Sequence, residues 1–216
     1  MIIRQETTSD ASAIYELVKT AFASAERSDG NEQDLVVLLH KSPAFQPALS
    51  LVAEENEKII GYILFSEIKI GEKTAIAPAP LAVLPEHQRK GVGLALLAEG
   101  HRIAKNFGYG ISVVLGSETY YPKAGYVPAS RFGIICPFEG VPDANYMALP
   151  LQEPAGDWNG TVTYDKAFLK YKGENHGYKS IYFIFAQQYP PDRIYGHSGG
   201  NIYTRKSGAF RTFCPE

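Results

Sequence analysis

The sequence predicts an α+β fold, in which helices flank a central, mostly antiparallel sheet whose strands splay apart at one point. Three observations support this fold class. Apolar-rich segments of strand length follow one another with short polar turns between them, which is typical of an antiparallel meander. Segments with apolar residues at helical spacing stand before and after this meander. Proline occurs inside one strand-like segment, where it cannot donate to a ladder, so strand pairing must be interrupted there.

The first part of the chain predicts one strand and two helices. Residues 2–7 alternate apolar and polar side chains, as a half-buried strand does. Residues 8–10, Thr-Ser-Asp, offer N-caps for a helix. The apolar positions of this helix recur at helical spacing: Ile14, Leu17, Val18, Ala21 and Phe22. A polar loop at residues 25–30 then precedes a second, short helix around residues 32–40.

The middle of the chain predicts three consecutive antiparallel strands, at residues 49–54, 58–70 and 73–83. The third of these segments contains Pro78 and Pro80. Because proline has no backbone N–H to donate, that strand must lie at an edge of the sheet, or be bulged or splayed where the prolines stand.

After the meander, the pattern changes from strands to one long helix. An apolar stripe runs through residues 91–107, and Gly108 is placed to end the helix. Residues 111–115 predict a short strand of buried type, and the turn-rich residues 116–125 predict a short helix. Another apolar segment and a closing strand at residues 145–151 complete the order β, α, α, β, β, β, α, β, short α, β, β.

Composition excludes several classes of protein. Hydrophobic residues make up 45% of the chain, charged residues 20%, and the net charge is −2, so neither intrinsic disorder nor a strong electrostatic grip on nucleic acid is favoured. We expect no membrane insertion and no secretion, because no apolar run is long enough to span a bilayer and no signal segment is recognisable. Cys136 and Cys214 form neither a disulfide framework nor a zinc motif, which favours a reducing, cytoplasmic location.

The composition changes near residues 154–156, which predicts a first domain at residues 1–156 and an extension at residues 157–216. The extension carries eight Lys and Arg against five Asp and Glu, and it holds thirteen aromatic residues. We expect an extended pair at residues 157–168 and a strand at residues 178–187. The extension should pack on the first domain or on a partner subunit in a homodimer, because so many aromatic side chains would otherwise face water.

One motif in the extension is a decoy. The sequence Gly-His-Ser-Gly-Gly at residues 196–200 satisfies the G-x-S-x-G pattern of α/β hydrolases. In that fold an acid and a histidine follow the serine along the chain, but no histidine follows here. We therefore interpret the motif as a turn.

The strongest chemical signal is a glycine-rich loop between the proline-bearing strand and the long helix. Gly91 and Gly93 allow the backbone to approach a ligand closely, and the first amides of a helix have no partners within it. Together with the helix dipole and the cations Arg89 and Lys90, the loop favours an anionic group such as a pyrophosphate. The alternative is a turn that merely joins a strand to a helix.

Residues 80–97, PLAVLPEHQRKGVGLALL, resemble motif A of the GNAT acyl-CoA N-acyltransferases. The pattern of that motif is Gln/Arg-x-x-Gly-x-Gly/Ala, and Gln88, Gly91 and Gly93 fill its fixed positions. Residues 119–126 resemble the second signature of the family, in the branch of predicted acetyltransferases that carries Tyr-Tyr-x-x-x-Gly-aromatic. The resemblance covers about residues 1–150 and implies the same mixed, mostly antiparallel splayed sheet.

The resemblance implies a site for acetyl-CoA as co-substrate. The splayed strand would pair with the pantetheine arm through the backbone of Leu81, Ala82 and Val83. The loop and the start of the helix would hold the pyrophosphate through main-chain amides of Gln88, Arg89, Lys90, Gly91, Val92, Gly93 and Leu94. The five histidines show no metal-ligand spacing, so we expect no metal.

The resemblance also implies a tyrosine general acid that protonates the departing thiolate. Tyr121 occupies that position, Tyr120 is an adjacent substitute, and the alternative is that Tyr121 is a core aromatic beside Gly125. The general base is harder to place, because the strand leading into motif A contains no acid. Glu118 and Ser117 follow the next strand and could face the cleft.

Three further acids lie in the segment that lines the acceptor pocket in this family: Glu26, Asp29 and Glu32. Each competes with the simpler interpretation of a solvated surface charge, and a water relay would remove the need for a base. We therefore expect an N-acetyltransferase that moves an acetyl group directly to a primary amine. The alternative is a non-catalytic acyl-CoA-binding sensor, which the missing acid favours.

Overall fold

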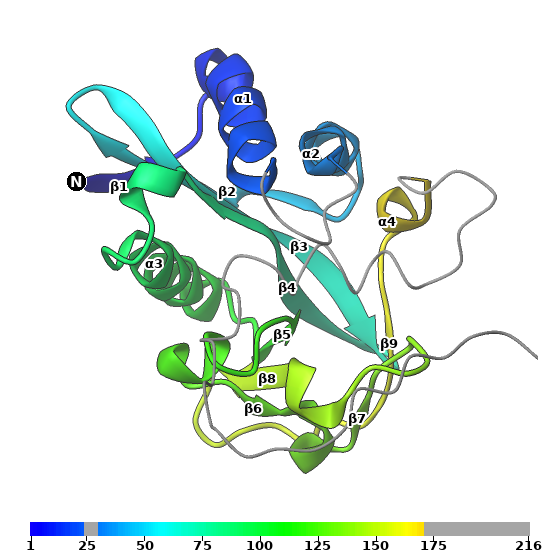
Figure 1. Cartoon of the computed structure of the whole chain (residues 1–216). Helices are drawn as coiled ribbons and strands as arrows, with labels where there is room; N and C mark the ends of the chain where they lie inside the picture. The colour runs from blue at the N-terminus through cyan, green and yellow to red at the C-terminus, as the bar shows by residue number, and fades with distance from the viewer. Residues whose placement is uncertain (24–29, 171–216) are drawn as a thin grey trace, which may run out of the picture.

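The computed structural model describes residues 1–23 and 30–170 of the chain (Figure 1). Within these residues the strands form one open sheet in the order β1-β2-β3-β4-β5-β8-β6, and β9 joins it by pairing with β3 and β7. All neighbouring strands along that path are antiparallel except β4 and β5, which are parallel. The predicted α+β class with a mostly antiparallel sheet is therefore confirmed.

The N-terminal elements follow the predicted order. Strand β1 spans Ile2–Gln5, a short 3-10 helix η1 spans Thr8–Asp10, and α1 spans Ala11–Phe22. All five apolar positions of the predicted stripe are buried. Arg4 on β1 forms ion pairs with Asp10 at 2.7 Å and Glu54 at 2.8 Å, which hold the start of α1 to the sheet. Helix α2 spans Glu32–His40, as predicted.

The meander is present, and its third strand does not lie at an edge. Strands β2, β3 and β4 span Phe45–Glu55, Lys58–Ile70 and Lys73–Val83. β4 lies between β3 and β5, and the prolines are accommodated in two ways. The register of the β3–β4 ladder shifts between Ile63 and Phe65, and β4 pairs with β5 only at Ile76↔Ser112 among the described residues. The strand is thus both bulged and splayed, and an edge position is the wrong one of the predicted alternatives.

Helix α3 spans Val92–Asn106 and lies on the opposite face of the sheet from α1 and α2 (Figure 1). Two glycines allow it to approach β3 closely. A Cβ atom on Gly61 would stand 2.8 Å from Val92 Cγ1, and a Cβ atom on Gly100 would stand 2.1 Å from the ring of Phe65. Neither position has room for a side chain, so these contacts set the depth at which α3 packs.

The second half of the sheet consists of short strands. β5 spans Ile111–Leu115 and is fully buried, and β8 spans Tyr146–Pro150 and pairs antiparallel with it. The predicted short helix is a 3-10 turn, η3, at Tyr121–Ala124. The apolar segment before β8 forms two strands, β6 at Val127–Pro128 and β7 at Ile134–Ile135, with 3-10 helices η4 at Ala129–Phe132 and η5 at Asp143–Asn145.

The start of the predicted extension differs from the expected extended pair. Residues 157–168 contain one strand, β9 at Gly160–Thr163, and helix α4 at Lys166–Lys170 follows it. Asp165 explains the change, because its side chain accepts a 2.8 Å bond from the amide of Ala167, as a helix N-cap does. Trp158 and Phe168 are buried in the same core as the first part of the chain.

The predicted strand at residues 178–187 and the turn at residues 196–200 lie outside the described residues, and a domain boundary at residue 156 stays a prediction. In the part of the chain that the structure describes, no helix is long and apolar enough to cross a membrane.

Candidate functional site

The splay between β4 and β5 is the central feature of the site. Beyond the Ile76↔Ser112 pair, the side of β4 that faces away from β3 has no strand partner among the described residues. Leu81, Ala82 and Val83 lie in this stretch and are at most 5% exposed. A strand edge without a strand partner is the kind of backbone to which an extended chain of another molecule can add.

The loop that follows β4 is tied back to the sheet. The amide of Leu84 donates to the carbonyl of Ile60 at 3.0 Å, and the side chain of Gln88 donates through Nε2 to the carbonyl of Val83 at 3.1 Å. A 3-10 turn, η2 at Pro85–His87, lies between these two bonds. The Gln88 side chain therefore shapes the loop, a function that the sequence pattern did not reveal.

The N-terminus of α3 has the geometry of an anion cradle. Gly91 is the N-cap residue with φ of +85°, and Arg89 has φ of +60°, so the backbone turns sharply before the helix begins. The first helical bond runs from the amide of Ala95 to the carbonyl of Gly91, at 3.0 Å. The amides of Val92, Gly93 and Leu94 therefore have no acceptor within the helix.

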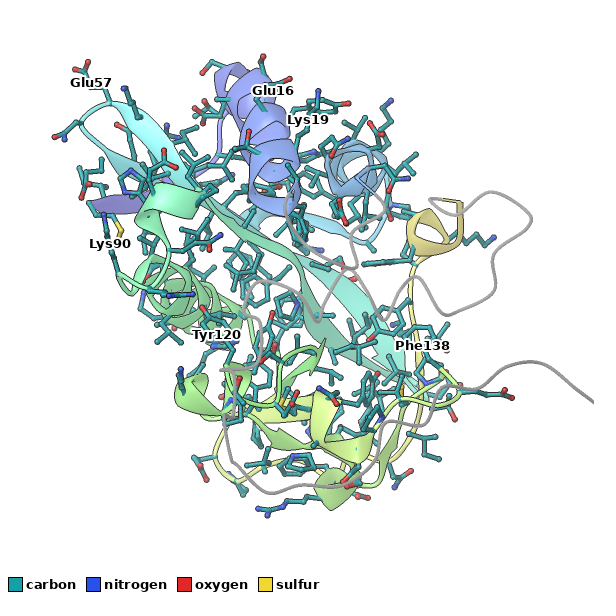
Figure 2. The ribbon with its side chains drawn as sticks, in the orientation of Figure 1. Glu16, Lys19, Glu57, Lys90, Tyr120 and Phe138 are labelled. Atoms are coloured by element: carbon teal, nitrogen blue, oxygen red, sulfur yellow. The ribbon has the colours of Figure 1, made fainter. Side chains whose placement is uncertain are left out.

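The surroundings of these amides are open and cationic. Nothing lies within 4 Å of the position where Gly91 would carry a Cβ atom, and Arg89 and Lys90 are exposed. Figure 2 shows Lys90 at the outer surface beside the start of α3. Amides, the helix dipole and two cations together favour a phosphate-bearing ligand at this point.

The two adjacent tyrosines lie in a turn at the end of β5. The carbonyl of Ser117 accepts bonds from the amides of Tyr120 at 3.1 Å and Tyr121 at 3.2 Å, which closes the turn. The two rings pack edge to face with their centroids 5.2 Å apart, and both residues are about 95% buried. η3 also contacts α3 (Tyr120 is labelled in Figure 2), so the turn packs against the helix that carries the cradle.

Tyr126, the aromatic residue that ends the tyrosine signature, has two polar partners that the sequence did not predict, His101 and Ser112. The Tyr126 hydroxyl lies 2.8 Å from Nε2 of His101 on α3 and 2.7 Å from Oγ of Ser112 on β5. The Tyr126 ring packs edge to face on Tyr121, with centroids 5.6 Å apart. Burial lowers the pKa of His101 to about 4, so its imidazole is neutral at pH 7, and burial raises the pKa of Tyr126 far above its ordinary value. His101 stands four residues after the buried Leu97, a spacing that places it on the inner face of α3.

Glu118 is exposed and accepts a 2.5 Å bond from Nδ2 of Asn145, which also donates to the carbonyl of Gly116 at 3.0 Å. These bonds tie the start of the tyrosine turn to the residue before β8. The Ser117 hydroxyl bonds to that of Thr119 at 2.9 Å, within the same turn. Whether either residue takes part in proton transfer stays a prediction.

Of the three acids expected near an acceptor, only Glu32 lies in the described residues. It is the first residue of α2 and is fully buried, so the interpretation of Glu32 as a solvated surface charge is wrong. A carboxylate is favoured at a helix N-terminus by the dipole, which helps to explain how α2 tolerates it. Across residues 1–23 and 30–170, no group of three or more His, Cys, Asp or Glu side chains is arranged to hold a metal ion.

Comparisons with known proteins point to one family. Residues 46–128 match a family model described as the acetyltransferase (GNAT) domain. The uncharacterized N-acetyltransferase YjhQ of Escherichia coli K12 is 39% identical over 126 residues, which cover 56% of this chain and 67% of YjhQ. The crystal structure of the GNAT N-acetyltransferase YhbS of E. coli in complex with CoA has a TM-score of 0.70 at 28% identity, over 78% of this chain and 91% of that one. A GNAT acetyltransferase of Brucella melitensis in complex with acetyl-CoA has a TM-score of 0.65 at 31% identity, over 77% and 97% of the two chains.

Proposed function

Since this chain belongs to the GNAT family of N-acetyltransferases, we propose that it transfers an acetyl group directly from acetyl-CoA to a primary amine. The enzyme class, an acetyl-CoA-dependent acyltransferase, follows from its relatives. The observation that carries the proposal is the splay of β4 from β5 beside the amide-lined start of α3, with Tyr121 at the end of β5. In this proposal the thioester carrier binds at the first two features and the third supplies the hydroxyl donor.

In the proposed site, acetyl-CoA binds along β4. The pantetheine arm pairs with the backbone of Leu81, Ala82 and Val83, and the pyrophosphate meets the loop and first turn of α3. The cradle amides belong to Gln88, Arg89, Lys90, Gly91, Val92, Gly93 and Leu94. CoA and acetyl-CoA are bound in the YhbS and Brucella structures, which share this fold at 28% and 31% identity.

The proposed reaction is a single displacement. The unprotonated amine attacks the thioester carbonyl, a C–N bond forms, the C–S bond breaks, and CoA leaves as a thiolate. Tyr121 donates its hydroxyl proton to that thiolate, and Tyr120 is the alternative donor. The acylated nitrogen loses its extra proton to water, and a proton from solvent restores the tyrosine hydroxyl. Holding the two substrates in one orientation supplies much of the acceleration, because the step becomes effectively unimolecular.

The amine must lose a proton before it attacks, because an ordinary alkylammonium has a pKa of about 10.4. Glu118 and Glu32 are the two described candidates for accepting that proton, directly or through water. Glu118 is exposed and bonded to Asn145, whereas Glu32 is fully buried on the side of the sheet that α2 covers. Substituting each by Gln in turn, with the pH dependence of kcat/KM as readout, distinguishes them: the base variant loses the acidic limb of the profile.

The function is tested by turnover with a panel of amines. Purified protein is mixed with acetyl-CoA and, in separate reactions, a polyamine, an aminoglycoside, a free α-amino peptide and a lysine peptide, and the released thiol is measured. We expect thiol release that depends on one class of amine and disappears in the Gly91→Glu variant. If acetyl-CoA binds by calorimetry and no amine accelerates thiol release above the amine-free rate, the non-catalytic sensor is the better function, as the lack of an acid on β4 would favour.

A further inference from the structure

We propose that His101, Tyr126 and Ser112 are positioning residues that hold Tyr121 at the thioester and fix its place relative to the coenzyme A cradle. The inference rests on the proposed function, in which Tyr121 is the general acid. None of the three residues is placed in contact with a substrate. They act through the ring and the turn that carry Tyr121.

The geometry makes Tyr126 the central residue of this group. Its side chain is 1% exposed, and its hydroxyl meets Ser112 Oγ at 2.7 Å and His101 Nε2 at 2.8 Å. One bond goes to β5 and the other to α3, so the Tyr126 ring is fixed at its far end by two different elements. Tyr126 follows Gly125, which ends η3 with φ of +91°, so the backbone next to the ring is fixed as well.

The fixed ring is a support for Tyr121. The planes of the two rings cross at 77° with centroids 5.6 Å apart, an edge-to-face arrangement with a defined geometry. Tyr120 also packs on Tyr121, with ring planes at 82° and centroids 5.2 Å apart. A rotation of the Tyr126 ring would therefore remove the surface against which Tyr121 packs and let the Tyr121 ring shift. A hydroxyl displaced by about 1 Å from the departing sulfur loses much of its value as a proton donor.

His101 connects this support to the cradle. It lies on α3, the helix whose first turn is expected to bind the pyrophosphate, and its ring also meets Phe65 of β3 edge to face at 5.5 Å. Phe65 fills the space beside Gly100, so the distance between this part of α3 and β3 is fixed by that contact. In the proposed complex, α3 therefore binds the pyrophosphate at its first turn and, through His101, bonds to Tyr126, which supports Tyr121 at the thioester.

Single substitutions test the positioning role with acetyl-CoA and the best acceptor of the amine panel. We expect Tyr126→Phe, which keeps the ring, to lower kcat by about tenfold while the calorimetric affinity for CoA and the acceptor KM stay within about twofold. His101→Leu should behave similarly. His101→Gln should retain most activity, because a neutral amide can replace a neutral imidazole as hydrogen-bond partner. Tyr109→Phe is the matched control, since it removes a tyrosine hydroxyl bonded to Glu67 at the far end of α3, and should leave kcat unchanged.

A double-mutant cycle separates positioning from general destabilisation. If Tyr126 acts through Tyr121, then Tyr121→Phe combined with Tyr126→Phe is no slower than Tyr121→Phe alone, because the group being positioned is already absent. If Tyr126 only stabilises the fold, the two losses multiply, and the inference is wrong. A Tyr126→Phe protein with normal kcat also overturns it.

Failure of the proposed function looks different. In that case no amine accelerates thiol release by the wild-type protein. If the wild type is active and Tyr121→Phe leaves kcat unchanged, the acid is not Tyr121 and the positioning role is wrong while the function stands. An activity-independent readout completes the test: fluorine NMR of protein labelled with 3-fluorotyrosine, in which the Tyr121 resonance is assigned by its loss in Tyr121→Phe. Tyr126→Phe should shift or broaden that resonance in the CoA complex, and an unchanged resonance contradicts the positioning role.

Discussion

The partly buried imidazole of His101 predicts a specific loss of stability in acid. The pKa of His101 falls from an ordinary 6.5 to about 4 because burial disfavours the charged ring. The unfolded chain therefore binds a proton on this histidine as the pH falls below 6.5, whereas the folded protein resists it until about pH 4. Protonation of the unfolded state lowers the free energy of unfolding, so stability is unaffected above pH 6.5 and is lost progressively between pH 6.5 and pH 4.

The size of this loss follows from the two pKa values. One pKa unit corresponds to about 1.36 kcal/mol, so the full contribution of His101 is about 3 kcal/mol. The assay is urea unfolding at several pH values between 7 and 4, for the wild type and His101→Gln. Gln keeps a polar partner for Tyr126 and cannot titrate, so the fall in stability should be smaller in the variant by about 3 kcal/mol at pH 4. Because other titrating groups are common to both proteins, equal pH dependences in the two would refute the lowered pKa of His101.

Three further predictions address the site and the extension. Gly91→Ala should lower the free energy of unfolding by about 1 kcal/mol, because φ of +85° strains any residue with a side chain. Gly91→Glu should in addition abolish CoA binding, through bulk and through the repulsion of like charges. Calorimetry on the folded variants checks both, and an unchanged CoA affinity in Gly91→Glu would contradict the assignment of the cradle. Tyr121→Phe should lower kcat by about 10²-fold with acetyl-CoA affinity unchanged, and a loss seen only in Tyr120→Phe moves the role by one residue. Truncation after Gly156 removes the buried Trp158 and should reduce solubility or change the oligomeric state in size-exclusion chromatography; a stable, monomeric and equally selective truncated protein would contradict a structural role for the extension.

Local pattern was enough to predict most elements of the fold. The bounds of α2, β3, β4 and β5 agree with the predicted segments, and the buried face of α1 is the predicted stripe. These elements are specified by apolar periodicity within a few residues, and glycine and polar turns mark their ends. The extended pair expected at residues 157–168 is wrong in its second half, because the side chain of Asp165 caps the start of α4.

The features of the candidate site likewise differ in whether neighbouring residues alone could predict them. The cradle could be predicted because an anion site at a helix N-terminus needs only consecutive residues: glycine at the N-cap, free amides and nearby cations. The burial of Glu32 could not be predicted, since its position at the start of α2 looks the same in sequence whether or not other elements cover it. The bond from Gln88 to the carbonyl of Val83 could not be predicted, because a side chain that returns to the preceding strand leaves no periodic signal.

Short stretches of sequence were enough to predict the order of elements, an interrupted ladder at the proline-bearing strand, and a loop suited to an anionic group, because each depends on residues close together in the chain. The packing of whole elements was needed to show that β4 lies inside the sheet and that Tyr126 is held between α3 and β5. Ser112 and His101 are 14 and 25 residues from Tyr126, and the His101 bond also requires α3 to pack on the sheet, where Gly61 and Gly100 leave room for it. Interactions at such separations are set by how elements stack in space, which is information that no short window of sequence contains.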